Sequence, residues 1–396
     1  MINQSTYENL SSELVFAAEL LVWEVGGLLL KLNKLGINNP GAVVAAREKY
    51  ETGLTKAIKK YKKSAIKWIN EDVAKAYIAG LTHSNSILRA NNLKTSNINS
   101  VLTGSFLIKS PPPIPPIPPI TGQQLAFFEG WQNHTQFFGV FRNAAYYSID
   151  KQPLQILRAG NDLYRDVSIM VGEQSYKESD IFTRRRMSQA LLNEYSKKGL
   201  QAIRYKDGRN VSIDTYSEML GRTITGRAAV QASLNRFVET GYPLCVVSAH
   251  FRACPLCTPY EGKILSVDGR HPDYESVADA ETQGLFHPNC LHDISVYIEG
   301  VSKPLETRTH PREQKLIDEY GYEEAQRLAY QAQLRQRAIE RNIRAYKRRS
   351  NTSLDKKTEE YNNKKTREWQ AKQRDHLKEN KFLRRKYERE QIKKAR

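Results

Sequence analysis

The chain has 396 residues, enough for two or three domains, and its hydrophobic fraction of 40% is compatible with globular structure. It carries 61 Lys and Arg against 43 Asp and Glu, a formal net charge of +18 that makes a polyanionic partner a candidate. Residues 1–13 have no basic segment, and no small-residue cleavage site follows the apolar run behind them, which argues against a secretory signal.

Residues 1–105 are predicted to form a helical module. The apolar run 14–32 has the length of a membrane span, but it contains Glu19 and Glu24, and Gly26-Gly27 should break it in the middle. Each charge inside a bilayer costs roughly 2.5 kcal/mol or more. We therefore interpret the run as a buried or partner-binding helix and expect no membrane span. Beyond residue 39, apolar side chains recur every three or four positions, which predicts further helix.

Residues 106–122 are predicted to be a linker. Within them, Ser110 to Thr121 read Ser-Pro-Pro-Pro-Ile-Pro-Pro-Ile-Pro-Pro-Ile-Thr, a sequence that can form neither a helix nor a central strand. Such a segment adopts polyproline II, with a rise of about 3.1 Å per residue. We favour a semi-rigid spacer over a docking site for a proline-binding domain.

Residues 123–200 are predicted to be helical. The last helix of this region should begin after Ser179-Asp180, a good capping pair, and end at Gly199. Two short β-segments then flank Asp207-Gly208, a hairpin signal, and are followed by a helix over 215–240 and a strand over 242–248.

The fold class follows from these elements. The chain is predicted to be mainly α, with a small α+β domain over residues 201–300 and a long basic helical tail over residues 301–396. In the α+β domain, the hairpin and strands should surround a cluster of Cys and His residues.

That cluster lies between Ser248 and His292, which enclose three of the four cysteines and four of the eight histidines. Cys254 and Cys257 share one Pro-containing turn, and His287 and Cys290 share another about thirty residues later. The spacing places two thiolates on one side of a tight turn while the second pair approaches from the other, as in tetrahedral zinc sites. Four protein ligands would leave no open position, so the zinc would be a structural staple.

Two alternatives stay open for these residues. His250 and His292 offer rival ligands, so the ligand set is not fixed by spacing. The cysteines could also be small core residues that a reducing compartment keeps as thiols.

Catalysis is the competing function class. A metal-dependent nuclease of the His-Asn-His kind could recruit His271, Asp273, His287, Asn289 and His292. Such enzymes also need a general-base His and a divalent metal outside the structural zinc, in a strand-turn-helix register that the sequence does not show. A nucleophile pair such as Cys257 with His250 has weaker support. We therefore predict that the chain is not an enzyme.

The tail holds much of the excess positive charge, with 28 Lys and Arg against 15 Asp and Glu over residues 301–396. Helical periodicity predicts one helix over 311–349 and another over 356–396. A solvated helical hairpin with alternating charges and a surface that contacts DNA phosphates are both compatible with this pattern. The candidate DNA-binding residues are Lys347, Arg348, Arg349, Arg384, Arg385 and Lys386. A free cytosolic DNA-binding protein is a third possibility.

Several separated blocks, in the same order, resemble the phage minor capsid protein 2 family over about residues 120–396. They are Asp207-Gly208-Arg209, Arg222-Thr223, Ser248-Ala249-His250, Gly262-Lys263, Asn289-Cys290-Leu291-His292 and the basic helix 336–344. The chain departs from that family where Cys254 and Cys257 replace Arg and His and where Leu291 replaces Arg. Cys-x-x-Cys with His-Pro-Asn-Cys instead resembles the related Mu F type of phage head morphogenesis protein.

The resemblance carries two ligand sets. The positions matched in the first family are His250, Cys257, Cys290 and His292, whereas those matched in the Mu F type are Cys254, Cys257, His287 and Cys290. It also implies a structural protein of a tailed phage or prophage, a minor capsid component that acts in head assembly near the portal. The implied partners are the portal, other capsid proteins and packaged double-stranded DNA. The implied location is the head of the virion, assembled in the bacterial host cytoplasm.

Overall fold

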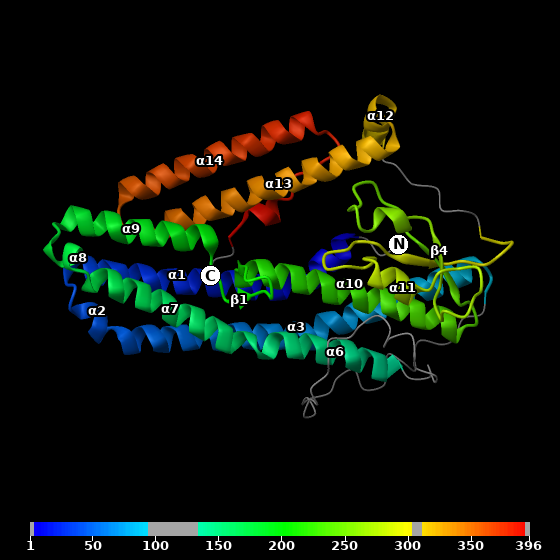
Figure 1. The fold of residues 1–396 in the computed structure, drawn as a ribbon, viewed down its shortest axis with the longest axis horizontal. Coiled ribbons are helices and arrows are strands. Elements are labelled where there is room, and N and C mark those ends of the chain that lie inside the picture. Colours follow the sequence, from blue (N-terminus) through cyan, green and yellow to red (C-terminus); the bar gives the residue numbers. More distant parts are fainter. Residues whose placement is uncertain (1–3, 94–133, 303–310, 393–396) are drawn as a thin grey trace. The chain divides into compact units, whose positions relative to one another are not determined.

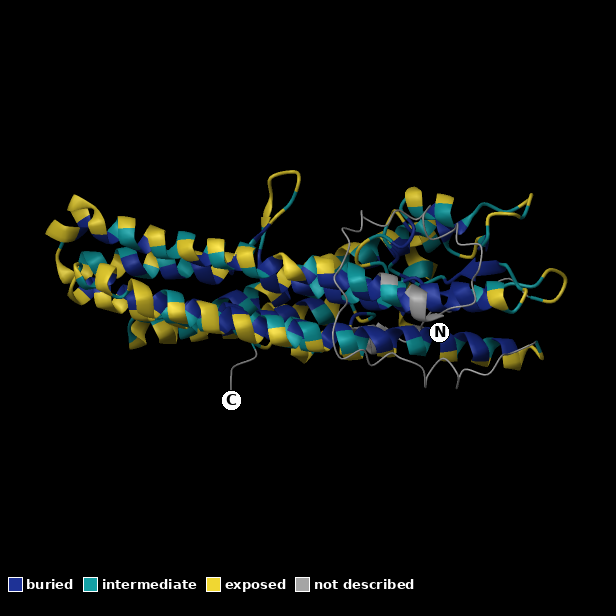
Figure 2. Ribbon diagram, turned by 90° about the horizontal axis from the view of Figure 1, so that it is seen from below, coloured by how far each residue is buried: buried dark blue, intermediate teal, exposed yellow. Residues whose placement is uncertain are grey.

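The computed structural model describes residues 4–93, 134–302 and 311–392, and it is mainly helical with small antiparallel sheets (Figure 1), as predicted. The chain divides into two compact units. The first unit comprises residues 1–13, 65–149 and 218–330, and the second comprises residues 14–64, 150–217 and 331–396. Most helices carry both buried and exposed residues (Figure 2), as expected for amphipathic helices that pack on one face.

The N-terminal region forms α1 (Gln4–Asn38), α2 (Ala42–Ala45) and α3 (Arg47–Ala90). The apolar run 14–32 is a buried helix, as predicted, with Leu14 and Leu29 fully buried. The expected break at Gly26-Gly27 was wrong, because α1 continues through both glycines. A Cβ at Gly26 would lie 3.2 Å from a ring carbon of Tyr195, so glycine at this position serves close packing within the second unit. Among the described residues, no helix is long and apolar enough to cross a membrane.

In the first unit, α3 packs closely against α10 (Ile213–Glu239). A Cβ at Gly80 would lie 2.2 Å from the carbonyl oxygen of Ala229, so the absence of a side chain allows the two backbones to approach. The hydroxyl of Ser233 also donates a hydrogen bond to the Gly80 carbonyl, at 3.3 Å. Further along α3, the indole of Trp68 donates to the Leu10 carbonyl at 2.8 Å, which fixes the start of α1 in the same unit.

Residues 134–198 form four helices: α6 (His134–Asp150), α7 (Gln152–Gly172), α8 (Gln174–Glu178) and α9 (Ile181–Lys198). The predicted ends of the last helix are confirmed. The carboxylate of Asp180 caps α9 by accepting from the Thr183 N–H at 2.8 Å, and Gly199 ends it with φ of 70°. The predicted linker 106–122 lies outside the described residues.

The predicted hairpin is present in the second unit. Strands β1 (Ile203–Arg204) and β2 (Asn210–Val211) pair antiparallel, and Gly208 has φ of +83° in the turn between them. Positive φ favours glycine at this position.

A second, three-stranded antiparallel sheet lies in the first unit, with order β4-β3-β5. Its strands are β3 (Leu244–Val247), β4 (Ile264–Ser266) and β5 (Ile294–Val296). Short helices η1 (Thr258–Tyr260) and α11 (Val277–Thr282) lie in its connections. All four residues of the central strand β3 are buried, and α10 contributes Phe237 to the same core.

The sheet topology explains the position of the Cys and His residues. Because β3 runs antiparallel to both neighbours, its C-terminal end at Val247 lies beside the N-terminal ends of β4 and β5. The chain leaves this end of the sheet into the loop 248–263 and returns to it through the loop 285–293. The Ser248 N–H donates to the Asp293 carbonyl at 2.8 Å, so the two loops are hydrogen-bonded where they meet the sheet.

The tail forms α12 (Pro311–Tyr320), α13 (Tyr322–Asn351), α14 (Lys356–Glu379) and the short helix η2 (Tyr387–Glu390). The prediction of one helix over 311–349 was wrong at Gly321, whose φ of 76° separates α12 from α13. In the second unit, α14 returns antiparallel along α13 (Figure 1), and the imidazole of His376 lies 2.9 Å from the Ala332 carbonyl.

The predicted helix over 356–396 was also wrong, because α14 ends at Glu379. The chain then folds back along α13, and side chains of α13 donate to its backbone carbonyls. Gln336 bonds to the Arg384 carbonyl at 2.9 Å and Arg344 to the Arg389 carbonyl at 2.6 Å. These tertiary hydrogen bonds replace the intrahelical bonds that a continuous helix would have made.

Candidate metal centre

Each predicted Cys and His pair sits on a tight turn. The Cys257 N–H donates to the Cys254 carbonyl at 3.0 Å, and the Cys290 N–H donates to the His287 carbonyl at 2.9 Å. Asn289 in the second turn has φ of 70°, in the left-handed region that asparagine tolerates better than most residues. Both turns therefore hold their paired side chains close together, as the spacing predicted.

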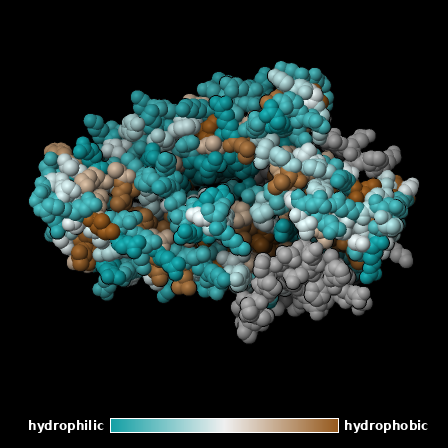
Figure 3. Space-filling view, viewed as in Figure 1, coloured by the Kyte–Doolittle hydropathy of each residue, from teal (hydrophilic) through white to brown (hydrophobic). Residues whose placement is uncertain are grey.

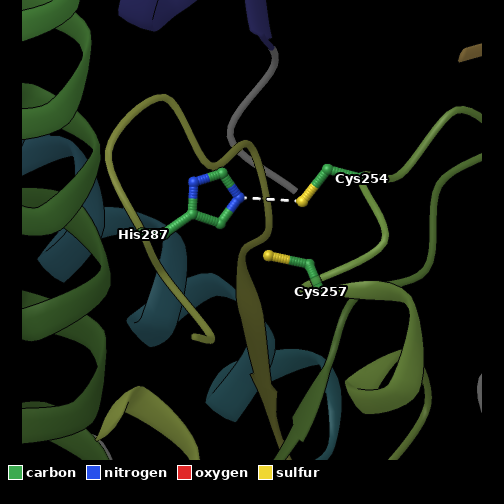
Figure 4. A group of neighbouring side chains, drawn as sticks. All are labelled: Cys254, Cys257 and His287. Atoms are coloured by element: carbon green, nitrogen blue, oxygen red, sulfur yellow. Dashed lines mark hydrogen bonds between the residues drawn. The ribbon is translucent and has the colours of Figure 1, made fainter. Parts of the chain in front are cut away.

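The two turns face one another. The Cys254 Sγ lies 2.8 Å from the His287 Nε2, and Cys257 lies beside them, with the three ligand atoms all within 4.8 Å of one another (Figure 4). The Cys257 Sγ is also 3.5 Å from the Cys290 Sγ. The four residues of the predicted zinc set thus converge at one end of the sheet.

The ring of His287 is oriented as a ligand. Its Nδ1 lies 2.7 Å from the Pro288 carbonyl oxygen, which accepts a hydrogen bond from a protonated Nδ1. That bond leaves the Nε2 lone pair directed at the sulfur of Cys254. Metal-bound histidines in proteins are commonly held in this way, with the second nitrogen donating to a carbonyl or carboxylate.

The rival ligand His292 lies on the other side of Cys290 and is almost fully buried. Its Nδ1 is 3.3 Å from the Cys290 Sγ, and its Nε2 is 3.2 Å from the Glu261 carboxylate. The ligand atoms of Cys257, Cys290 and His292 form a second group within 4.8 Å. These two groups together offer five candidate ligand atoms, and Cys257 belongs to both.

His250 contacts the ring of His292 and belongs to neither of the two groups that contain thiols. Its ring stacks on that of His292 with centroids 4.1 Å apart, and burial lowers the pKa of His250 to about 4. The buried Nε2 of His250 has no hydrogen-bond partner among the described residues. His250, Glu261 and His292 make a third group whose ligand atoms lie within 4.8 Å.

The Cys290 thiol is poised for deprotonation. The pKa of Cys290 is lowered to about 4, chiefly by a hydrogen bond from Cys257 and also by the contacts with His292. The same hydrogen bond and burial raise the pKa of Cys257, so Cys257 keeps its proton more firmly than Cys290 does. Metal ions bind thiolates rather than thiols, so a bound cation would take the place of that proton.

The fourth cysteine is a core residue. Cys245 lies in the middle of β3, fully buried in the hydrophobic cluster, and burial raises the pKa of its thiol to about 12.

Sequence reasoning did not identify Glu261, which touches both His250 and His292. A lone glutamate in a loop gives no pattern to recognise, and its role depends on a contact that the fold creates.

Of the residues considered for a nuclease, His287 and His292 contact the thiols, but His271 and Asp273 do not join them. The backbone N–H of Asp273 donates to the Nδ1 of His271 at 3.2 Å, and the Nε2 of His271 lies 3.8 Å from Glu299. Neither His271 nor Asp273 belongs to any of the three possible metal-binding groups in the described part of the chain.

The first basic cluster of the tail points into the second unit. The Lys347 ammonium donates to the Glu390 carbonyl at 2.7 Å, and the Arg348 guanidinium donates to the Ser196 carbonyl at 2.9 Å and lies 3.4 Å from the Asp214 carboxylate. The guanidinium of Arg349 lies 4.8 Å from the centre of the Tyr346 ring.

The second basic cluster is divided. Arg385 makes two hydrogen bonds of 2.7 Å to the carboxylate of Glu390, whose side chain is 1% exposed. Arg384 is exposed and Lys386 is half-buried. The surface over α14 is mostly hydrophilic (Figure 3), and its exposed basic residues include Lys356, Lys357, Lys364 and Arg367.

Comparison with known proteins identifies the family. The family model for phage minor capsid protein 2 matches residues 151–378, which is more than half of the chain and includes the whole Cys and His centre. A relative described as a structural protein of Lactococcus phage LL-H is 28% identical over 215 residues, covering 50% of this chain and 54% of the relative. The chain thus spans about half the length of that relative. No solved structure matches. The chain belongs to the phage minor capsid protein 2 family.

Proposed function

We propose that this protein is a minor component of the phage head, located near the portal, where it acts in head assembly and is not an enzyme. The observation that carries the proposal is the family match over residues 151–378. The domain boundaries predicted from the sequence remain part of this proposal, with the region 201–300 as the domain that carries the Cys and His motif and the helical regions as surfaces for portal and capsid partners. On this account the protein is assembled into the head in the host cytoplasm.

The proposal includes a structural zinc ion bound by Cys254, Cys257, His287 and Cys290. The donor set fits this group, because thiolates and imidazoles are the preferred ligands of tetrahedral zinc. The separations of 2.8 Å and 3.5 Å between paired donors mean that little movement is needed to bring them around one ion. His292 and His250 remain the alternate ligands. When bound, the ion would join the loops 248–263 and 285–293 into one folded end of the sheet.

Contact with packaged DNA is the second part of the proposal. It is supported by the formal charge of +18 and by the exposed basic residues of α14. Contacts of this kind reach phosphates and carry no sequence information. The clusters at residues 347–349 and 384–386 contribute less than their charge suggests, because Lys347, Arg348 and Arg385 bind groups of the protein itself.

The experiment that tests the head assignment is quantitative mass spectrometry of purified phage particles, combined with chemical cross-linking. We expect a copy number well below that of the major capsid protein and cross-links to the portal. Particles that contain normal amounts of DNA but none of this protein would contradict the assignment. A cross-linking pattern restricted to the tail would contradict its placement near the portal.

A further inference from the structure

The loop 248–263 does more than carry two cysteines, because the start of the tail packs against it within the first unit. Three contacts join this loop to residues 312–330. They are an ion pair of 3.7 Å between Arg252 and Glu313, a ring contact of 6.1 Å between Phe251 and Tyr322, and a hydrogen bond of 3.0 Å from the Gln326 amide to Glu261.

Glu261 joins the tail to the centre through its two carboxylate oxygens. Oε1 accepts from the backbone N–H of His250 at 2.8 Å and lies 3.2 Å from the Nε2 of His292, whereas Oε2 accepts from the Gln326 amide. The carboxylate side chain is 8% exposed. A buried carboxylate is stabilised by such hydrogen bonds, so a change on either side alters the position of the other.

The tail side of this contact is equally buried. Gln326 is 5% exposed and lies between Ala325 and Ala329, which have no exposed surface. A buried amide without its acceptor carries an unfavourable desolvation free energy. The docked position of residues 322–330 therefore depends on where the Glu261 carboxylate is held.

We propose that Glu261 is a positioning residue that couples the Cys and His centre to the docking of residues 312–330. This inference rests on the proposed metal site. On one side Glu261 orients His292, whose Nδ1 faces the sulfur of the proposed ligand Cys290, so the carboxylate acts on that ligand through the imidazole. On the other side it anchors Gln326. Since coupling between two binding events is reciprocal, metal binding strengthens docking of the tail by the same factor by which docking strengthens metal binding.

The coupling has a matched pair of test variants in α13. Gln326→Ala removes the amide that reaches Glu261. Gln336→Ala removes another buried glutamine of the same helix, which donates to Glu340 and to the Arg384 carbonyl instead. Two quantities are measured on the full chain: the affinity for Co²⁺, from the absorption bands of thiolate-bound cobalt, and the amide hydrogen exchange of residues 312–330 with and without metal.

In the wild type, we expect metal to slow exchange in residues 312–330. Gln326→Ala should weaken Co²⁺ binding by less than the roughly tenfold effect of removing a direct partner of a ligand, because Gln326 acts on Cys290 through Glu261 and His292. It should also reduce the metal-dependent change in exchange, which the contacts of Arg252 and Phe251 still support in part. Gln336→Ala should keep the wild-type Co²⁺ affinity and the wild-type response of residues 312–330.

Exchanging the two side chains, Glu261→Gln together with Gln326→Glu, provides a rescue experiment for the coupling. Glu261→Gln still offers an oxygen to His292 but turns its amide toward the Gln326 amide, so two donors face each other. Adding Gln326→Glu restores a donor and an acceptor, and we expect it to recover most of the coupling. A merely structural defect at either position would not be repaired by the swap.

Two outcomes would overturn the coupling, and they are distinguishable. If the wild type binds Co²⁺ through its thiolates but residues 312–330 exchange equally fast with and without metal, the coupling is wrong and the proposed centre stands. If the wild type binds neither Co²⁺ nor Zn²⁺, the centre and the coupling are both wrong.

Discussion

The Cys and His loops and the basic clusters of the tail were both identified from residue type. In the structure, their side chains make different kinds of contact. In the loops, the ligand atoms of Cys254, Cys257 and His287 face one another within 4.8 Å. In the tail, Lys347, Arg348 and Arg385 donate to carbonyls and carboxylates of their own unit. Donor groups that converge on one point could hold a metal ion together, whereas charged groups that are already hydrogen-bonded to the protein contribute to its folding.

The largest effect should come from the loops. Replacing Cys254 or Cys290 by Ser should lower the free energy of unfolding by about 5 kcal/mol or more, because structural zinc contributes roughly 10–16 kcal/mol of binding free energy in small zinc domains. Chemical denaturation of the zinc-loaded chain measures the change.

The fourth cysteine supplies the control for that measurement. Cys245→Ala leaves the ligand set intact and removes one buried atom from β3, so it should cost only about 1 kcal/mol, as for other small core truncations. Equal stability of the wild type and both Ser variants would contradict a structural metal in the loops.

The next largest effect should come from the tail, although no ligand is involved. Arg385→Ala leaves the carboxylate of Glu390 buried without its guanidinium, which should lower the free energy of unfolding by about 3 kcal/mol. The neighbouring Arg384→Ala removes an exposed side chain and should leave the stability nearly unchanged. Thermal unfolding of the two variants compares them, and equal stability would mean that the Arg385 cluster is not structural.

The smallest effect concerns DNA. If α14 contacts phosphates, replacing its exposed Lys356, Lys357, Lys364 and Arg367 by Ala should weaken binding to any sequence. The slope of log affinity against log salt should fall by about 1 for each phosphate that the variant no longer neutralises. Arg348→Ala, which removes a guanidinium already bound to Ser196 and Asp214, should leave the slope unchanged. A larger decrease of the slope in Arg348→Ala than in the α14 variant would mean that Arg348 contacts phosphates. It would contradict the conclusion that this residue serves folding.

The features that the sequence predicted have local causes. Asp180 and Gly199 mark the two ends of α9, and both ends were predictable because capping and positive φ are properties of a few neighbouring residues. The Asp207-Gly208 turn and the two Cys and His turns were predicted for the same reason. In each case the chemistry of a short segment restricts its own backbone.

The features that the sequence did not predict have tertiary causes. The ring of Tyr195 packs on Gly26 within the continuous helix α1, and the segment after Glu379 lies along α13, which supplies hydrogen-bond donors to it. The contact between Glu261 and Gln326 joins residues far apart in the chain. No local pattern carries such information, because each of these contacts exists only once the chain has folded.

The most direct test of the central claim is the metal content of the purified full chain, measured by elemental mass spectrometry alongside Cys254→Ser and Cys245→Ala. The account predicts about one zinc per chain in the wild type and in Cys245→Ala, and a large loss of zinc in Cys254→Ser. A wild-type chain that contains no metal and takes up none on dialysis against zinc would contradict it.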